Sequence, residues 1–167
     1  MKRIAEFQKV TRERFIQDSK SLIEDGHAAY DELRLPCRAT KGSAGYDFFL
    51  PCDLTLMPAQ SIKVPTGIRV RMKEGWALQI YPRSGLGFKS RLQMDNTVGI
   101  VDADYYGAEN EGHIFIKMTN DTHDDKTLNL RKGDAFAQGI FVEFGITVDD
   151  EADGVRLGGL GSTGRRL

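Results

Sequence analysis

The sequence predicts an all-β sandwich or barrel that follows an N-terminal strand and helix. From about residue 33 onward, short stretches rich in branched and aromatic residues alternate with Gly, Pro, Asp and Asn. Closely spaced strands with turn residues between them are typical of sandwiches and barrels. No helix-length segment separates these stretches, which argues against a parallel sheet with crossover helices. The expected strands are 44–50, 61–64, 67–72, 76–81, 113–118 and 135–144.

The two ends of the chain differ from this middle part. Residues 1–10 can form an edge strand, and Thr11 can cap a helix that runs to about Asp25, where Gly26 suits the helix end. Near the C-terminus, an acidic segment reads as a solvated linker and a glycine-rich, flexible arm follows it. The expected parts are an N-terminal extension (1–32), a β-domain (33–147) and a linker with the C-terminal arm (148–167).

Composition limits the classes of function. The 167 residues carry 23 Lys and Arg against 24 Asp and Glu, so the chain lacks the general basic character that duplex nucleic acid binding needs. No apolar run approaches the roughly 18 residues of a membrane span, and we expect a cytoplasmic protein. Cys37 and Cys52 do not form a metal-binding pair, and two reduced cysteines in or near the core are favoured over a disulfide.

Three segments carry residue types suited to phosphate chemistry. Pro82 can end a strand and leave Arg83, Ser84 and Gly85 at its tip as a phosphate-binding loop, or as an ordinary hairpin corner. Asp102 follows an apolar stretch in a segment with a hairpin's composition. Its carboxylate could act as a general base, or belong to a solvated turn. Arg156 precedes 158–164 (GGLGSTG), which can wrap an anion with backbone amides or remain a disordered tail.

Together, five segments resemble the motifs of the homotrimeric dUTPase family, in the family's order. They are 43–47 (SAGYD), 82–86 (PRSGL), 99–107 (GIVDADYYG) preceded by Asn96, 133–138 (GDAFAQ), and Arg156 with 158–164. The resemblance implies a jelly-roll β-fold and a homotrimer whose active sites are each shared among three subunits. It also implies hydrolysis of dUTP to dUMP and pyrophosphate, which limits uracil incorporation into DNA and supplies dUMP.

The resemblance further implies a role for each matching residue. Asp102 would orient and deprotonate the water that attacks the α-phosphorus, and Gln138 would bond the α-phosphate region or that water. Mg²⁺ would ride on the triphosphate, with Asp47 touching its shell through water. The implied substrate contacts are Asn96 and the backbone of Gly99, Ile100 and Val101 for uracil, Tyr105 for deoxyribose, Arg83, Ser84 and Gly85 for phosphates, and Arg156, Gly161, Ser162 and Thr163 for the γ-phosphate.

The sequence departs from the family pattern in three places, of which the N-terminal extension is one. Leu160 stands where the family's tail usually carries an aromatic that stacks on the base. An insertion at 108–112 follows the third motif, and we hypothesise that it supplies a substitute lid, with His113 or Phe115 as the candidate.

Two other functions remain open from the sequence. One is a dCTP deaminase-like enzyme of the same fold, although the form of 82–86 favours a dUTPase. The other is a nucleotide-sensing binding protein with a regulatory protein partner. The products formed from dUTP and dCTP distinguish the enzymes, and a nucleotide-dependent pull-down tests for a partner.

Overall fold

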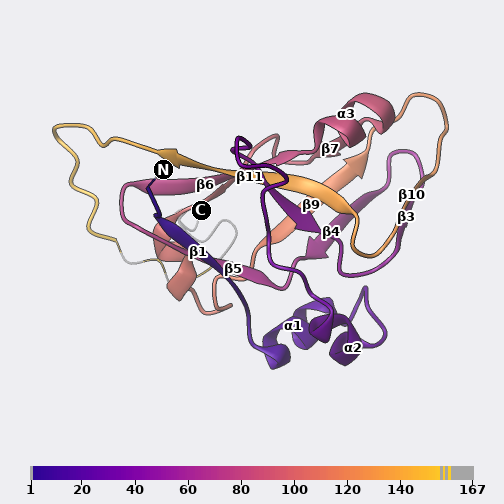
Figure 1. The fold of residues 1–167 in the computed structure, drawn as a ribbon, viewed down its shortest axis with the longest axis horizontal. Coiled ribbons are helices and arrows are strands. Elements are labelled where there is room, and N and C mark those ends of the chain that lie inside the picture. The colour runs from indigo at the N-terminus through magenta and orange to yellow at the C-terminus, as the bar shows by residue number, and fades with distance from the viewer. Residues whose placement is uncertain (1, 155, 157, 159–167) are drawn as a thin grey trace, which may run out of the picture.

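The computed structural model describes residues 2–154, 156 and 158, which form an antiparallel, jelly-roll-like β-barrel with two small helices at one side (Figure 1). The strands are β1 (Ala5–Lys9), β2 (Tyr46–Phe49), β3 (Leu54–Leu56), β4 (Ser61–Pro65), β5 (Ile68–Met72), β6 (Trp76–Pro82), β7 (Leu92–Met94), β8 (Gly99–Val101), β9 (Phe115–Asn120), β10 (Leu128–Leu130) and β11 (Ala135–Glu143). The helices are α1 (Arg12–Ser19), α2 (Gly26–Asp31), α3 (Ser84–Ser90) and the 3-10 helix η1 (Ala103–Gly107).

Every strand pair is antiparallel, which confirms the predicted all-β class. One sheet has the order β2-β11-β6-β8, a second has the order β4-β9-β7, and β1-β5 and β10-β3 form two-stranded pairs. Side chains from these sheets share one core, whose fully buried members include Phe48, Leu78, Ile116 and Phe136. All six predicted strands are present; the four additional strands β3, β7, β8 and β10 have three residues each, too few to show an alternating pattern.

The segment after β6 differs from the prediction, because it forms helix α3 and not a loop or hairpin corner. Pro82 ends the pairing of β6 with β11, and Arg83 keeps an extended backbone before the helix begins. The amide of Gly87 donates to the carbonyl of Arg83 at 2.9 Å, and Arg91 ends the helix in the left-handed conformation. Two glycines inside a seven-residue helix hide the helical pattern from a reading of composition.

The segment from 95 to 107 is also not the hairpin that its composition suggested. Strand β7 pairs with β9, whereas β8 pairs with β6, so the turn between β7 and β8 connects two different sheets. Gly99 is buried in β8, and a Cβ atom there would lie 3.2 Å from the side chain of Met94 and 3.4 Å from that of Ile80. The third motif therefore places a short edge strand tightly on the barrel and continues directly into η1.

The N-terminal extension contains two helices and not the single predicted one. Thr11 caps α1 as predicted, since its hydroxyl accepts a hydrogen bond from the amide of Arg14, but α1 ends at Ser19. Gly26, expected at a helix end, is the first residue of α2, and Asp25 caps that helix through the amide of Ala28. Aspartate is among the preferred N-cap residues, and the cap at Asp25 places Gly26 at a helix start despite the preference of glycine for helix ends.

A small second core joins the extension to the barrel. It consists of Val10, Phe15, Ile23, Ala29 and Leu33, with Leu22 and Cys52 contacting both cores. Gly67 has φ +73°, and a Cβ atom there would lie 2.3 Å from Leu33 and 3.1 Å from Phe15. The missing side chain at Gly67 therefore lets the extension pack directly onto the barrel.

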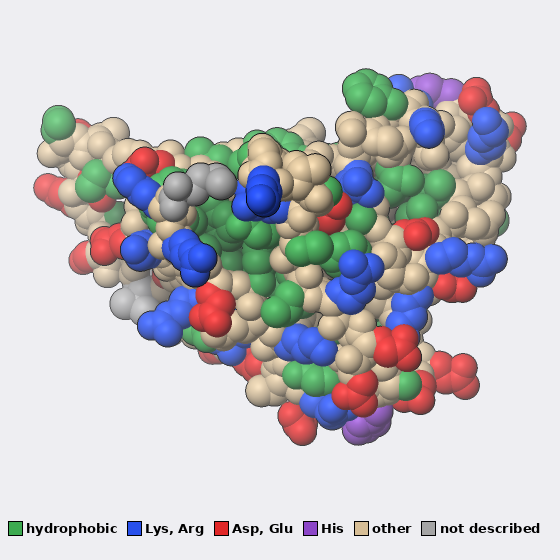
Figure 2. Space-filling view, viewed as in Figure 1, with side chains coloured by type: hydrophobic (Ala, Val, Ile, Leu, Met, Phe, Trp, Pro, Cys, Tyr) green, Lys and Arg blue, Asp and Glu red, His purple; other side chains and the backbone are tan. Residues whose placement is uncertain are grey.

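The cysteines, the surface and the helix lengths add four observations. Cys37 and Cys52 are free, but only Cys52 is half-buried at the core, whereas Cys37 is exposed. The acidic segment 148–154 is exposed along its length, as predicted. Charged side chains of both signs are interspersed on the face shown in Figure 2. No helix in the described part of the chain is long and apolar enough to cross a membrane.

Truncating Phe15 tests whether the extension is integral to the fold. Phe15 is 0% exposed, so we expect Phe15→Ala to lower the free energy of unfolding by about 3–5 kcal/mol in urea titrations. Met57→Ala is the control, because this side chain is 60% exposed and its loss should change stability by only about 0.5 kcal/mol. Equal stabilities of the two variants would contradict an integral extension.

Candidate active site

The predicted site residues fall into two groups. The first group, called here the phosphate-end group, is Asp47, Arg83, Ser84, Gly85 and Gln138, at the end of β6 and the start of α3. Gln138 of β11 lies opposite Asp47 of β2 on one side and opposite Tyr81 of β6 on the other. This register brings Arg83 Nε to 3.2 Å from Asp47 Oδ1.

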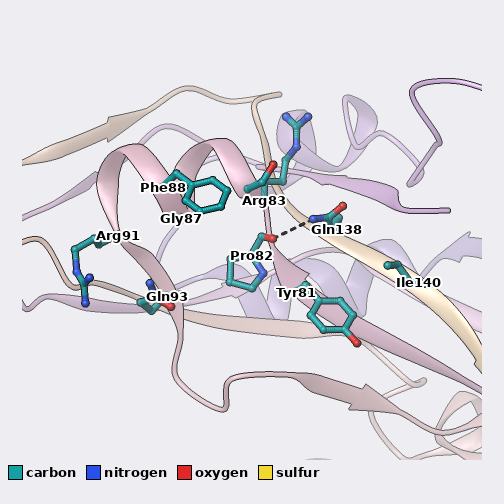
Figure 3. A pocket seen from close by; sticks show the side chains of 10 residues that line it. Tyr81, Pro82, Arg83, Gly87, Phe88, Arg91, Gln93, Gln138 and Ile140 are labelled. Carbon is teal, nitrogen blue, oxygen red and sulfur yellow. Dashed lines mark hydrogen bonds between the residues drawn. The ribbon is translucent and has the colours of Figure 1, made fainter. Parts of the chain in front are cut away.

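A pocket of about 630 Å³ opens beside this group. Figure 3 shows Gln138 reaching from β11 to donate to the carbonyl of Pro82, at 3.2 Å, with Arg83 near the same end. Helix α3 forms another wall, because Ser84, Gly87, Phe88 and Arg91 follow helical spacing along one face. The pocket is lined by Tyr81, Pro82, Arg83, Ser84, Gly87, Phe88, Arg91, Gln93, Gln138 and Ile140.

These residues suit an anion with several oxygen atoms. Arg83 provides a forked cation, and Ser84 provides a hydroxyl at the start of α3. The amides in the first turn of a helix, here those of Ser84 and Gly85, have no acceptor within the helix. The phosphate-end group can therefore donate several hydrogen bonds to phosphate oxygens.

The second group, called here the base-end group, is Asn96, Gly99, Ile100, Val101, Asp102 and Tyr105, along β8 and η1. In the described chain β8 is one of the two edge strands of its sheet and pairs only with β6. Because alternate backbone groups of an edge strand point away from its partner, β8 presents N–H and C=O groups to a planar ligand. Ile100 is 63% exposed on this strand.

Asp102 stands where β8 passes into η1, and its side chain is 46% exposed. Arg156 donates to Asp102 at 2.5 Å and to Asp104 at 2.8 Å, and its guanidinium lies 5.9 Å from the centre of the Tyr105 ring. The resemblance implied that Arg156 binds the γ-phosphate. In this structure its guanidinium binds the carboxylates of Asp102 and Asp104. Gly161, Ser162 and Thr163, and also Leu160, lie outside the described residues.

Tyr105 is 8% exposed and is fixed at its hydroxyl. The hydroxyl donates to the carbonyl of His113 at 2.8 Å and accepts from Asn110 Nδ2 at 2.7 Å. Burial raises the pKa of Tyr105, so the hydroxyl keeps its proton for this bond. The ring is thus held at its hydroxyl end, and the Tyr105 amide donates to the Asp102 carbonyl at 3.2 Å.

The proposed base Asp102 and the phosphate-binding Arg83 lie at opposite ends of β6, whereas Gly99 pairs with Ile80 between them. Val101 pairs with Leu78, which places Asp102 beside Ala77, whereas Arg83 follows the last residue of β6. Six residues of extended strand separate backbone positions by about 20 Å. One chain therefore does not bring Asp102 and Arg83 to the same phosphorus atom.

The structure contradicts the hypothesis that His113 acts as a lid. His113 is 0% exposed, its Nδ1 lies 2.7 Å from Asp18 Oδ2, and its Nε2 accepts a hydrogen bond from the amide of Gly67 at 2.8 Å. Phe115 is partly buried, with Lys63 Nζ 4.3 Å from its ring centre and the His113 ring 4.5 Å away. The insertion is held by the N-terminal extension, a contact that local sequence cannot reveal.

The described residues fit a metal ion only in an outer role. No three His, Cys, Asp or Glu side chains among them gather as a binding group. Asp47 is a single carboxylate, 18% exposed, with one oxygen next to Arg83. A magnesium ion at this place would take most ligands from phosphates and water, with Asp47 reaching its water shell.

Sequence reasoning missed several residues of the site. Asp104 shares Arg156 with Asp102, and Asn110 binds the Tyr105 hydroxyl. Phe88 and Arg91 line the pocket through their helical spacing from Ser84, a signal that appears once α3 is known to be a helix.

The comparisons with known proteins agree with this geometry. A family model described as dUTPase matches residues 31–164. The chain belongs to the dUTPase family. A deoxyuridine 5'-triphosphate nucleotidohydrolase of Lactococcus lactis subsp. lactis is 38% identical over 135 residues, covering 79% of this chain and 89% of the relative.

Solved dUTPase structures share the fold. The Streptococcus mutans dUTPase superposes with a TM-score of 0.65 at 32% identity, covering 84% of this chain and 97% of that chain. A D95N dUTPase from phage phi11 of S. aureus, described with a structural Mg(II) ion, has a TM-score of 0.63 at 19% identity, covering 91% of this chain and 98% of that chain. At this low identity the phage likeness concerns the fold alone.

The buried His113 predicts a pH dependence of stability. Burial lowers the pKa of His113 below 6.5; Arg14 lowers it further, and Asp18 and Glu111 oppose the shift. The neutral ring is favoured in the folded state, so its contribution is complete above about pH 6.5 and is lost as the pH falls.

We expect stability to fall between pH 7.5 and 5.5 by more in the parent protein than in His113→Asn, measured by urea unfolding. Depressed carboxylate pKa values whose causes do not include His113, such as those of Asp53 and Asp95, affect both proteins alike. An identical pH dependence in the two proteins would exclude His113 as the titrating group.

Proposed function

We propose that this protein is a dUTP diphosphatase, which hydrolyses dUTP to dUMP and pyrophosphate. The single observation that carries the proposal is the match of the dUTPase family model to residues 31–164, a range that includes both groups of site residues. The phosphate-end group supports it with donors for an oligophosphate. The base-end group supports it with an exposed carboxylate at the end of an edge strand.

In the proposed reaction, Asp102 orients a water molecule and takes its proton. The water oxygen forms a bond to the α-phosphorus, the bond from that phosphorus to the bridging oxygen breaks, and pyrophosphate leaves. Gln138 bonds the α-phosphate region or the water, and Arg83, Ser84 and Gly85 hold phosphate oxygens. Such positioning and charge neutralisation is most of what phosphoryl transfer requires.

Mg²⁺ carried on the triphosphate supplies further neutralisation of phosphate charge, with Asp47 at its water shell. The position of Asp47 beside Arg83 supports this role. The phage phi11 relative described with a structural Mg(II) ion is consistent with a metal in the family.

Recognition of the nucleoside is proposed for the base-end group. The free edge of β8, from Gly99 to Val101, together with Asn96, offers a fixed set of donors and acceptors for uracil. Cytosine would leave some of these groups unpaired, which hydrogen-bonding sites reject by factors on the order of 10⁴. The Tyr105 ring lies against the deoxyribose and leaves no room for a ribose 2'-hydroxyl.

The length of β6 supports a site shared between subunits of a homotrimer. A distance of about 20 Å between Asp102 and Arg83 in one chain exceeds what their side chains can bridge around one phosphorus atom. The phosphate-end group of one subunit would therefore face the base-end group of another. Arg156, with Gly161, Ser162 and Thr163, would close over the γ-phosphate.

Removing the charge of Asp102 tests the general base. We expect Asp102→Asn to bind a non-hydrolysable dUTP analogue with nearly unchanged affinity while the turnover number falls by about 10²–10⁴, measured by pyrophosphate release. The same assay on dCTP, read for ammonia, tests the deaminase alternative. Near-normal turnover of Asp102→Asn would remove the carboxylate from the mechanism.

Mixing two inactive variants tests the shared site. Asp102→Asn and Arg83→Ala each damage a different group, so trimers formed after joint refolding contain some sites with both groups intact. We expect each variant alone to be nearly inactive and the refolded mixture to recover a measurable fraction of pyrophosphate release. A mixture no more active than its components would indicate that one chain builds the whole site.

A further inference from the structure

We propose that Asp18 of the N-terminal extension, acting through His113 and Asn110, positions the Tyr105 ring and so contributes to the rejection of ribonucleotides. The inference rests on the proposed role of Tyr105 against the sugar. It gives a specific task to residues that lie before the matched family region, which begins at residue 31. Asp18 is a positioning residue here, since it contacts His113 and not the nucleotide.

The Tyr105 hydroxyl is where this positioning reaches the site. It donates to the His113 carbonyl at 2.8 Å and accepts from Asn110 at 2.7 Å. Asn110 also donates to the same carbonyl at 3.4 Å, so hydroxyl, amide and carbonyl form one closed set. The orientation of the ring consequently depends on where His113 and Asn110 are held.

His113 is held from both sides of its imidazole. Nε2 accepts the amide proton of Gly67 at 2.8 Å, which leaves Nδ1 as the protonated nitrogen. Nδ1 donates to Asp18 at 2.7 Å, and the ring is 0% exposed. Of these two anchors, Gly67 belongs to the barrel and Asp18 belongs to helix α1, so one of the two hydrogen bonds that hold the imidazole comes from the extension.

The extension also holds the turn that carries Asn110. The amide and hydroxyl of Thr11 donate to the Glu111 carboxylate at 2.8 and 2.6 Å, and Arg14 donates to the carbonyl of Glu109 at 3.4 Å. Gly112 has φ +69°, and a Cβ atom there would lie 2.6 Å from the Tyr105 carbonyl oxygen. The turn therefore lies directly against the backbone of Tyr105.

The hydrogen bonds that hold the Tyr105 hydroxyl and the His113 ring have a kinetic consequence. A ring that excludes a 2'-hydroxyl works only if it cannot tilt away from the sugar, and a displacement of about 1 Å can change rates by about 10²-fold. Loss of the Asp18 anchor should therefore raise the rate on UTP more than it lowers the rate on dUTP.

The test compares kcat/KM for dUTP and UTP in the intact, assembled protein. We expect Asp18→Ala to lower the dUTP-to-UTP ratio by about tenfold or more, and Asp18→Asn, which keeps an acceptor oxygen for Nδ1–H, to retain most of it. Asp31→Ala is the matched control, because it removes an extension carboxylate that binds Arg12, away from Tyr105. The control should leave the ratio unchanged.

A double mutant separates positioning from a general loss of stability. Tyr105→Phe keeps the ring but removes the hydroxyl, so it should lower the ratio, and adding Asp18→Ala should lower it no further. If Asp18→Ala does not fold, His113→Asn decides, because it removes the imidazole that Asp18 holds, and the same loss is expected. An unchanged ratio in the folded Asp18→Ala, or in His113→Asn where that variant decides, would overturn the inference, as would full additivity in the double mutant. A parent protein that releases no pyrophosphate from dUTP would instead refute the proposed function.

Discussion

The pairing of β6 with β11 on one side and with β8 on the other is the constraint on which the site depends. β11 brings Gln138 to the end of β6, next to Arg83 and Asp47, whereas β8 carries Asp102 to the opposite end. Because a strand has a fixed rise per residue, no change of side-chain conformation brings Asp102 and Arg83 of one chain together. A chain built in this way is suited to forming sites between subunits, where two such ends can face each other.

The parts of the site that the sequence predicted are those that follow from local residue types. Arg83, Ser84 and Asp102 stand directly at strand ends, and turn and strand patterns suffice to place them there. The same local reasoning failed where two local preferences competed. Gly26 can end a helix or follow a capping aspartate. The two glycines within α3 favour a loop in a prediction from composition, although the segment is helical.

The residues that sequence reasoning could not place depend on contacts between distant segments. Asp18 and His113 are 95 positions apart, and no periodicity links them. A histidine beside an insertion looks like a surface group until α1 is known to cover it. Its burial removes the lid hypothesis and at the same time makes the insertion a link between the extension and Tyr105.

Arg156 forms ion pairs with Asp102 and Asp104, although the proposed function assigns it to the γ-phosphate of the substrate. The side chains of Asp102 and Asp104 are 46% and 56% exposed, but that of Arg156 is 18% exposed, so solvent screens these ion pairs only in part. Fully exposed pairs contribute about 0–1 kcal/mol each, whereas charge-assisted bonds from arginine to phosphate oxygens are among the stronger hydrogen bonds in proteins. In the proposed function, the phosphates of dUTP would therefore compete with Asp102 and Asp104 for the guanidinium of Arg156.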